Sequence, residues 1–203
     1  MCFGAFVAKD MKSITVFCGA SIGIDPIHRD HAIALGKYLG ENKLRLIFGG
    51  GKIGMMGAVA DATLAAGGEV IGVIPTFLKT KEVAHDNLTV MHTVKTMHER
   101  KMLMHDLGDG VLALPGGFGT LEELFEMLTW AQLGLHPKPI ALLNINGYFN
   151  HLLFFMDHMV KEGFLSESNR AMVLVHHEVV TLLHMMHAYV APDVPKWINA
   201  DEV

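Results

Sequence analysis

A glycine-rich turn is the feature of this sequence best suited to binding an anion. Residues 115–120 read Pro-Gly-Gly-Phe-Gly-Thr and follow the apolar run 111–114. Glycine permits positive φ and has no Cβ to hold a ligand away from the backbone, and Thr120 stands where a helix N-terminus favours a hydroxyl. Free N–H groups and the positive end of the helix dipole would then point to one spot, an arrangement that binds phosphate.

Two carboxylates follow this turn directly, at Glu122 and Glu123. Carboxylates in a first helical turn usually serve as caps or dipole partners, which explains at least one of the two. A second anion beside a bound phosphate does not help binding. The pair therefore indicates chemistry next to the phosphate.

A second glycine-rich turn lies at residues 49–54, where Gly49, Gly51 and Gly54 fit the dinucleotide pattern G-x-G-x-x-G. The following strand, 70–74, ends in Pro75-Thr76 without the acidic residue that would bind a ribose. The turn also lacks the Gly-Lys-Ser/Thr of a P-loop. Two glycine turns at the carboxyl edge of one sheet instead suggest a mononucleotide held between them.

Cations and a hydroxyl are further candidate contacts. Arg100 and Lys101 lie near the start of a predicted helix, 97–107, where positive charge opposes the dipole. An anionic ligand would explain them, and a plain surface pair is the alternative. Ser21 follows the first predicted strand, 14–18, as either a ligand contact or a helix-start hydroxyl without a ligand.

The elements that must position these residues alternate between strand and helix. This order predicts an α/β fold, a single-domain Rossmann-like doubly wound parallel sheet with helices on both faces. We expect an N-terminal extension at 1–12, one nucleotide-binding catalytic domain at 13–190 and a C-terminal tail at 191–203. The other predicted strands are 44–48, 88–91, 140–144 and 173–175. The other predicted helices are 26–39, 55–66, 148–161 and 178–189. A further helix follows the glycine-rich turn at 115–120 and ends at Gly134.

Composition excludes several classes of protein. The chain has 203 residues and a net charge of −5 without a basic run, so nucleic acid is a poor candidate partner. Its two cysteines suit a reducing compartment, with the cytoplasm as the default, and no apolar run is long enough to span a membrane. The 13 histidines do not occur with other ligands at metal-binding spacing, so we expect no metal.

Three segments resemble the LOG family of cytokinin riboside 5′-monophosphate phosphoribohydrolases, whose bacterial members are often labelled lysine decarboxylases. Residues 115–123 resemble its PGGxGTxxE signature, and residues 97–101 resemble its MHxRK segment. Residues 49–57 resemble its GGGxxGLMG segment, with Met55 where leucine is more usual. The resemblance extends from about residue 14 to about residue 183.

The resemblance implies hydrolysis of the N-glycosidic bond of a nucleoside 5′-monophosphate to free base and ribose 5-phosphate, without a cofactor. The substrate would be AMP or an N6-modified cytokinin riboside monophosphate, and the assembly a homodimer or larger. Arg100 and Glu123 match the residues considered catalytic. Further substrate contacts are implied for Glu82, Arg100, Lys101, Gly117, Phe118, Gly119, Thr120, Leu121, Glu122, Glu123 and Thr129. The glycine turns and the first strand end add Ser21, Gly49, Gly50, Gly51, Gly54, Met55 and Gly116.

Two other functions stay open at this point. A nucleotide or molybdenum-cofactor carrier would have the same fold and glycine turns without turnover, although the presence of both Arg100 and Glu123 favours the enzyme. A lysine decarboxylase would need pyridoxal phosphate or an equivalent, and the sequence offers no pocket for it. The identity of the base, and whether Arg100 serves the base or the phosphate, are also open.

Overall fold

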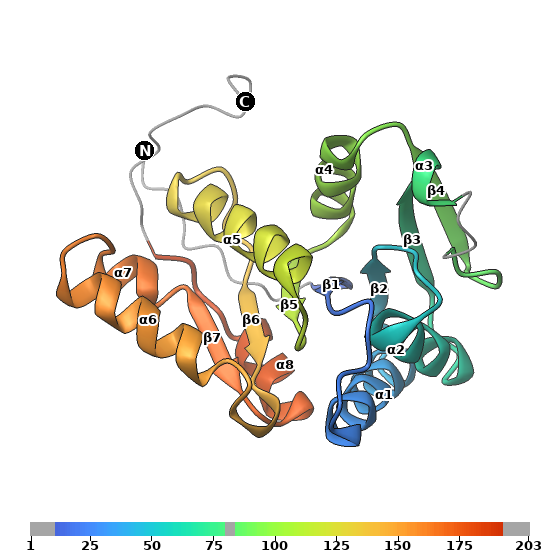
Figure 1. Cartoon of the computed structure of the whole chain (residues 1–203), viewed down its shortest axis with the longest axis horizontal. Coiled ribbons are helices and arrows are strands. Elements are labelled where there is room, and N and C mark those ends of the chain that lie inside the picture. The colour runs from blue at the N-terminus through green and yellow to red at the C-terminus, as the bar shows by residue number, and fades with distance from the viewer. Residues whose placement is uncertain (1–10, 80–83, 193–203) are drawn as a thin grey trace.

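The protein is built around a single parallel sheet. The computed structural model describes residues 11–79 and 84–192, in which seven strands lie in the order β4-β3-β2-β1-β5-β6-β7 (Figure 1). All of the strand pairs are parallel, which confirms the predicted α/β class. The strands are β1 (Ser13–Phe17), β2 (Arg45–Phe48), β3 (Val70–Pro75), β4 (Val90–Val94), β5 (Gly110–Ala113), β6 (Ile140–Leu143) and β7 (Val173–His176).

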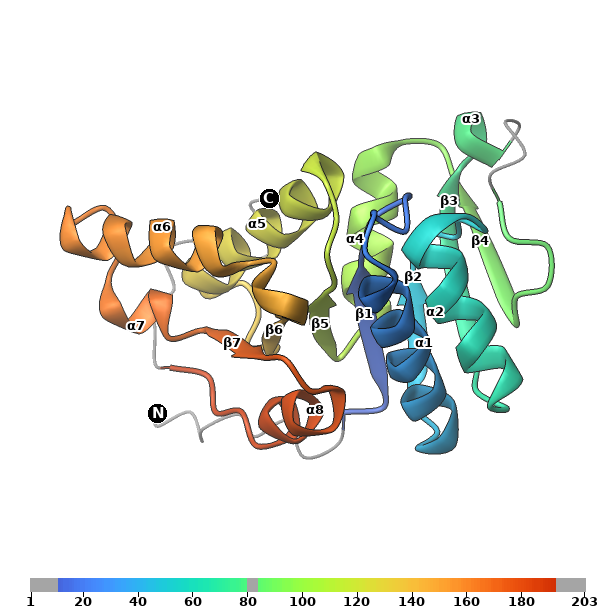
Figure 2. The same ribbon diagram turned by 60° about the horizontal axis from the view of Figure 1, so that its bottom comes forward.

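Helices cover both faces of the sheet, as predicted (Figures 1 and 2). One face packs against α1 (Pro26–Glu41), α2 (Gly54–Ala65) and α8 (Val179–His187). The other packs against α4 (Met97–Leu107), α5 (Phe118–Gln132) and α6 (Asn150–Lys161). Shorter helical segments are α3 (Thr76–Lys79), the 3-10 turn η1 (Ile145–Gly147) and α7 (Glu167–Arg170).

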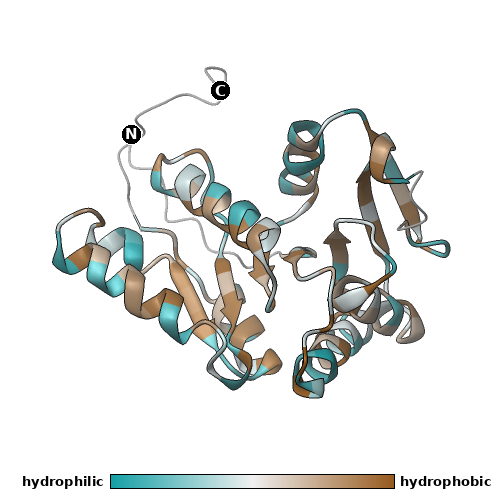
Figure 3. Ribbon diagram, in the orientation of Figure 1, coloured by the Kyte–Doolittle hydropathy of each residue, from teal (hydrophilic) through white to brown (hydrophobic). Residues whose placement is uncertain are grey.

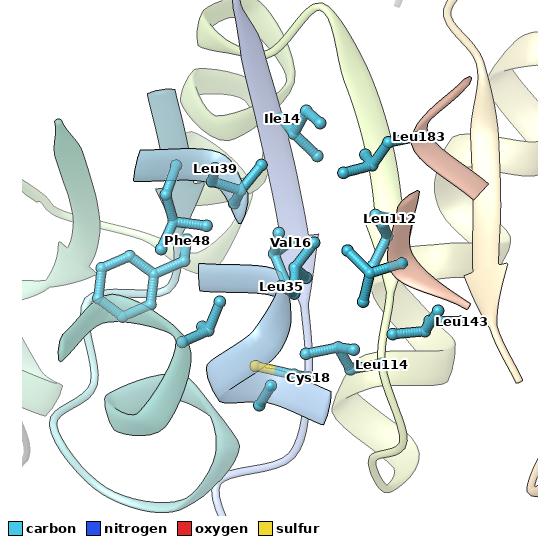
Figure 4. Close-up of a cluster of buried hydrophobic side chains, with 14 of the residues drawn as sticks. Ile14, Val16, Cys18, Leu35, Leu39, Phe48, Leu112, Leu114, Leu143 and Leu183 are labelled. Carbon is cyan, nitrogen blue, oxygen red and sulfur yellow. The ribbon is translucent and has the colours of Figure 1, made fainter. Parts of the chain in front are cut away.

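Most residues of the strands are hydrophobic (Figure 3), because helices cover both faces of this parallel sheet. Alternate residues of β1 enter different clusters: Ile14 and Val16 pack with α1, and Phe17 packs on the opposite face. Figure 4 shows the first of these clusters, in which Cys18 lies beyond the end of β1 near Leu35 of α1. The apolar runs in the sequence were therefore sufficient to predict the central strands.

Two predicted boundaries were wrong for local reasons. Strand β4 begins at Val90 rather than at residue 88, since the Thr89 hydroxyl accepts a hydrogen bond from the Val70 N–H (3.0 Å) in place of a strand carbonyl. The predicted helix 148–161 starts at Asn150 instead, because the preceding residues Asn146 and Gly147 have φ of 49° and 70°. These left-handed residues end η1 before α6 begins at Asn150.

The ends of the chain are only partly described. Residues 1–10 of the expected extension and 193–203 of the expected tail lie outside the described residues. Met11, inside that extension, is buried against the core cluster of α1 and α8. Across the described part of the chain, no helix is both long and apolar enough to cross a membrane.

Candidate active site

A pocket of about 290 Å³ lies beyond the carboxyl ends of β1 and β2. In open α/β sheets, ligands bind where the strand order reverses direction, which here is between β1 and β5. The register places Val16 of β1 beside both Phe48 of β2 and Leu112 of β5, so the loops after these strands meet. The pocket is lined by Val16, Phe17, Cys18, Gly19, Ala20, Gly49, Met56, Arg100, Gly117, Gly119, Thr120 and Glu123.

The first glycine turn forms one wall of the pocket, but its glycines do not act as predicted. None of the three has a positive φ: Gly116, Gly117 and Gly119 all lie outside the left-handed region. Gly117, with a φ of −96°, is the N-cap of α5. Thr120 is not the cap either; it is a buried residue inside the helix. A Cβ on Gly116 would collide with the Thr120 side chain, so this glycine is required for close packing.

The same turn presents open backbone to the pocket. A Cβ on Gly117 or Gly119 would meet no atom within 4 Å, so nothing in the described chain covers them. Within residues 11–79 and 84–192, no group accepts a hydrogen bond from the N–H groups of residues 117–120, as is usual for a first helical turn. Free backbone donors together with the positive end of a helix dipole are suited to bind an anion.

The second glycine turn mainly supports the pocket. Gly50 and Gly54 have φ of 75° and 66°, and a Cβ on Gly54 would collide with the backbone of Ala20. Of the predicted contacts Gly49, Gly50, Gly51, Gly54 and Met55, the structure places only Gly49 in the pocket lining. The Met55 side chain is 1% exposed in the core, while its neighbour Met56 lines the pocket.

Arg100 enters the pocket from the first turn of α4. That helix is fixed at its start by Thr96, whose hydroxyl accepts from the Glu99 N–H (3.1 Å), and farther along by the Thr15 hydroxyl, which donates to the Met104 carbonyl (2.9 Å). Arg100 is 9% exposed, so the surface-pair alternative is wrong for this residue. Its Nε donates to the Val73 carbonyl (3.1 Å) and its Nη2 to the Gly49 carbonyl (3.2 Å).

Gly49 is required by the position of Arg100. A Cβ on Gly49 would occupy the place of the Arg100 guanidinium. The remaining nitrogen, Nη1, makes only a weak contact to the Met97 sulfur at 3.8 Å. The arginine is thus held rigidly while at least one of its donors stays available to a ligand.

Glu122 and Glu123 have different surroundings although they are neighbours on α5. Glu122 pairs with Lys101 (2.5 Å), which also contacts Glu126 (3.0 Å). Burial lowers the pKa of Lys101, but its hydrogen bonds to Glu122 and Glu126 outweigh this effect and raise it overall. Lys101 is therefore positively charged, and its ion pairs link α4 to α5.

Glu123 lines the pocket and makes no hydrogen bond to any described residue. Burial raises the pKa of its carboxyl to about 7, because the positive charge of Arg100 offsets only part of the cost of removing the carboxylate from water. A carboxyl that titrates near neutral pH beside a buried cation is suited to act as a general base.

The pocket also contains residues that the sequence did not single out. Cys18, Gly19 and Ala20 follow β1, and the rule that ligands bind beyond strand ends was a signal for them. Burial raises the pKa of the Cys18 thiol well above its usual range, and the negative charge of Glu123 adds to this effect. The thiol stays protonated, so it is not a nucleophile.

The other predicted contacts that the structure describes are not part of this pocket's lining. The exposed Ser21 hydroxyl accepts from the Gly23 N–H (3.3 Å), and Asp25 rather than Ser21 caps α1. The Phe118 side chain is 94% exposed, and Leu121 packs against the core. Thr129 donates to the Phe125 carbonyl (2.7 Å) beside a separate apolar pocket, and Glu82 lies outside the described residues.

No cluster of at least three His, Cys, Asp or Glu side chains suited to a metal occurs in the ranges 11–79 and 84–192. The pocket itself presents backbone donors, the Arg100 cation and the Glu123 carboxyl.

Comparisons with known proteins show which family the chain resembles. Residues 56–186 match the family model described as possible lysine decarboxylase. The cytokinin riboside 5′-monophosphate phosphoribohydrolase of Rhodococcoides fascians is 49% identical over 165 residues, which cover 81% of this chain and 83% of that protein. A probable enzyme of the same name from Oryza sativa subsp. japonica is 46% identical over 179 residues, covering 88% of this chain and 79% of that protein.

Solved structures share the fold at low sequence identity. The molybdenum cofactor carrier protein of Chlamydomonas reinhardtii has a TM-score of 0.67 at 19% identity and covers 88% of this chain and 99% of that chain. The molybdenum cofactor binding protein of Rippkaea orientalis has a TM-score of 0.66 at 20% identity, covering 86% and 94%. At these identities the likeness shows the fold alone.

Proposed function

This chain belongs to the LOG family, and we propose that it is an N-glycosidase that hydrolyses a nucleoside 5′-monophosphate to free base and ribose 5-phosphate. The observation that carries the proposal is the meeting in one pocket of a buried arginine, Arg100, and a carboxyl, Glu123, that makes no hydrogen bond to a described residue. The relatives are named for the same reaction on cytokinin riboside 5′-monophosphates.

The phosphate is bound by the first turn of α5. The free N–H groups of residues 117–120 and the helix dipole face it, and Gly117 and Gly119 let it approach the backbone. This binding energy is remote from the bond that breaks, so it can hold the ribose in place for the reaction.

Glu123 acts at the ribose. Cleavage of an N-glycosidic bond passes through an oxocarbenium-like ribosyl group, which a nearby carboxylate stabilises while it orients or deprotonates the attacking water. Water attacks the anomeric carbon, the bond from that carbon to the base nitrogen breaks, and the electron pair leaves with the base. Arg100 supplies the positive charge, either to the departing base or to the phosphate.

The competing functions have weaker support in the pocket. A carrier has no need of a carboxyl whose pKa is near 7 beside the ligand. A pyridoxal enzyme needs a neutral lysine, yet among the described residues none of the lysines lines the pocket, and the raised pKa of Lys101 keeps that nearby amine charged. We propose that the enzyme works without a cofactor, in the cytoplasm.

The proposed reaction is tested by incubating purified protein with AMP and, separately, with isopentenyladenosine monophosphate. We expect chromatography to show free base and ribose 5-phosphate, and the faster substrate identifies the preferred base. Nucleotide binding without any release of base would contradict the enzyme and support a carrier. A pyridoxal absorbance band in the purified protein would instead support a decarboxylase.

We also propose that the protein assembles as a homodimer or larger. Several large apolar side chains are exposed in the single chain, among them Phe154 and Phe164, and contiguous patches of such side chains mark protein–protein interfaces. Gel filtration is expected to give at least twice the chain mass of 22.3 kDa. Elution at the mass of one chain would refute the assembly.

A further inference from the structure

Tyr148 contacts the phosphate-binding turn from outside the pocket. It follows η1, in the loop after β6, and β6 is the neighbour of β5 in the sheet. Its hydroxyl donates a hydrogen bond to the Gly116 carbonyl at 2.6 Å. Its ring makes edge contacts with His28 of α1 (5.7 Å between centroids) and with Phe149 (5.0 Å).

The ring is well placed to hold this hydroxyl in position. Phe149 is buried in the core cluster of α5 and α6, and its N–H donates to the Asn144 side chain (2.8 Å). The Tyr148 ring therefore packs against a residue that is fixed in the core, although 46% of Tyr148 is exposed. A single rigid aromatic side chain thus joins the loop after β6 to the turn after β5.

The hydrogen bond fixes the orientation of one peptide group. The described chain has no cis peptide bond, so the Gly116 carbonyl and the Gly117 N–H point in opposite directions. Because glycine flanks this peptide on both sides, a flip of the peptide plane would meet little steric resistance. With its carbonyl held by Tyr148, the peptide keeps the Gly117 N–H directed away from that side.

The preceding carbonyl is also engaged, since Pro115 accepts from the Gly19 N–H at 3.1 Å. A flip of the Gly116–Gly117 peptide would turn an oxygen toward the site where the phosphate is bound, and the two would repel each other. The carbonyls of Pro115 and Gly116 are thus both occupied by donors from other parts of the chain.

We propose that Tyr148 is a positioning residue that keeps the Gly116–Gly117 peptide in its anion-binding orientation. The proposal rests on the proposed function, because it assumes that the turn binds the phosphate of the substrate. It predicts that Tyr148 acts on phosphate affinity and not on the bond-breaking step, which belongs to Glu123.

The test is Tyr148→Phe, which removes the hydroxyl and keeps the ring contacts. We expect KM for the nucleotide to rise about five- to tenfold, the size of one partly exposed hydrogen bond, with kcat nearly unchanged. The dissociation constant of ribose 5-phosphate, measured by calorimetry, should rise by the same factor. Tyr38→Phe is the matched control, because the Tyr38 hydroxyl makes no hydrogen bond to a described residue, and it should change neither value.

A purely structural role would give another pattern. Loosening of α5 would displace Glu123 as well, so kcat would fall together with affinity. An equal fall in kcat, or unchanged KM and ribose 5-phosphate affinity, would overturn the proposal. Absence of nucleotide hydrolysis by the wild-type protein would contradict the proposed function instead, while the calorimetry would still report on Tyr148.

Discussion

Glu123→Gln is expected to lower kcat by about a thousandfold while nucleotide binding is largely retained, since loss of one transition-state charge interaction has this magnitude. The amide has the size of the carboxyl but cannot carry the charge that stabilises an oxocarbenium-like ribosyl group. It also cannot take a proton from water. Steady-state assays and calorimetry with the same nucleotide separate these effects, and Glu123→Ala should give the same result.

Glu122→Gln is the matched control for this substitution. Glu122 lies one residue earlier on the same helix, but its carboxylate is more than half exposed and pairs with Lys101. The exposed carboxylate contributes little to this pair, and Lys101 keeps its contact with Glu126, so we expect kcat to change by no more than about threefold. Equal losses in the two variants, or loss of nucleotide binding in Glu123→Gln, would contradict the assignment of Glu123 as the catalytic carboxylate.

The raised pKa of Glu123 makes both activity and stability depend on pH. As the reaction needs the carboxylate, kcat/KM should rise as pH increases through about 7. The pKa of Glu123 in the folded protein lies above the ordinary glutamate value of 4.5, so the stability contributed by the protonated form is complete below pH 4.5 and is lost as pH rises through about 7. The free energy of unfolding of Glu123→Gln should therefore exceed that of the wild type by on the order of 2–3 kcal/mol at pH 8 but not at pH 4.

Arg100→Met is expected to lower kcat/KM by about a hundredfold or more, because the pocket loses its buried positive charge. Arg100→Lys should not restore activity, since one ammonium group cannot reproduce the planar donors that reach the Val73 and Gly49 carbonyls. Methionine fills a similar volume, but the two carbonyls lose their partners, so unfolding should be measured in parallel.

The two catalytic residues should be coupled through charge. Arg100 lowers the pKa of Glu123, so the midpoint of the pH profile should move to higher pH when Arg100 is replaced by Met. Arg45→Met is the matched control, because Arg45 pairs with Glu69 on the protein surface (2.9 Å). An unshifted pH profile in Arg100→Met would show that Arg100 does not act on Glu123.

Much of the fold could be predicted from the sequence, because the signals were local. Continuous apolar runs specify buried parallel strands, and glycine turns between strand and helix place ligand sites at the carboxyl edge. Helix α4 was predicted with both of its ends from the helical spacing of its residues, and in the structure Thr96 caps it and Gly108 follows it. The glycine-rich turn at residues 115–120 and Arg100 could likewise be chosen as candidates from local features of the sequence.

The roles of individual side chains depended on tertiary packing. Successive residues of a helix point about 100° apart, so whether Glu122 or Glu123 faces the pocket depends on how α5 is rotated against its neighbours. The same holds for Met55 and Met56 on α2, one of which is in the core and the other in the pocket.

Long-range contacts decided the rest. Only the structure shows that Gly116 is needed for close packing against Thr120. It also shows that Gly49 makes room for Arg100, which is 51 residues away in the chain. Tyr148 is likewise 32 residues from the carbonyl that it holds. The sequence determined which chemical groups lie at the edge of the sheet, and the packing of helices onto that sheet determined which of them face one another.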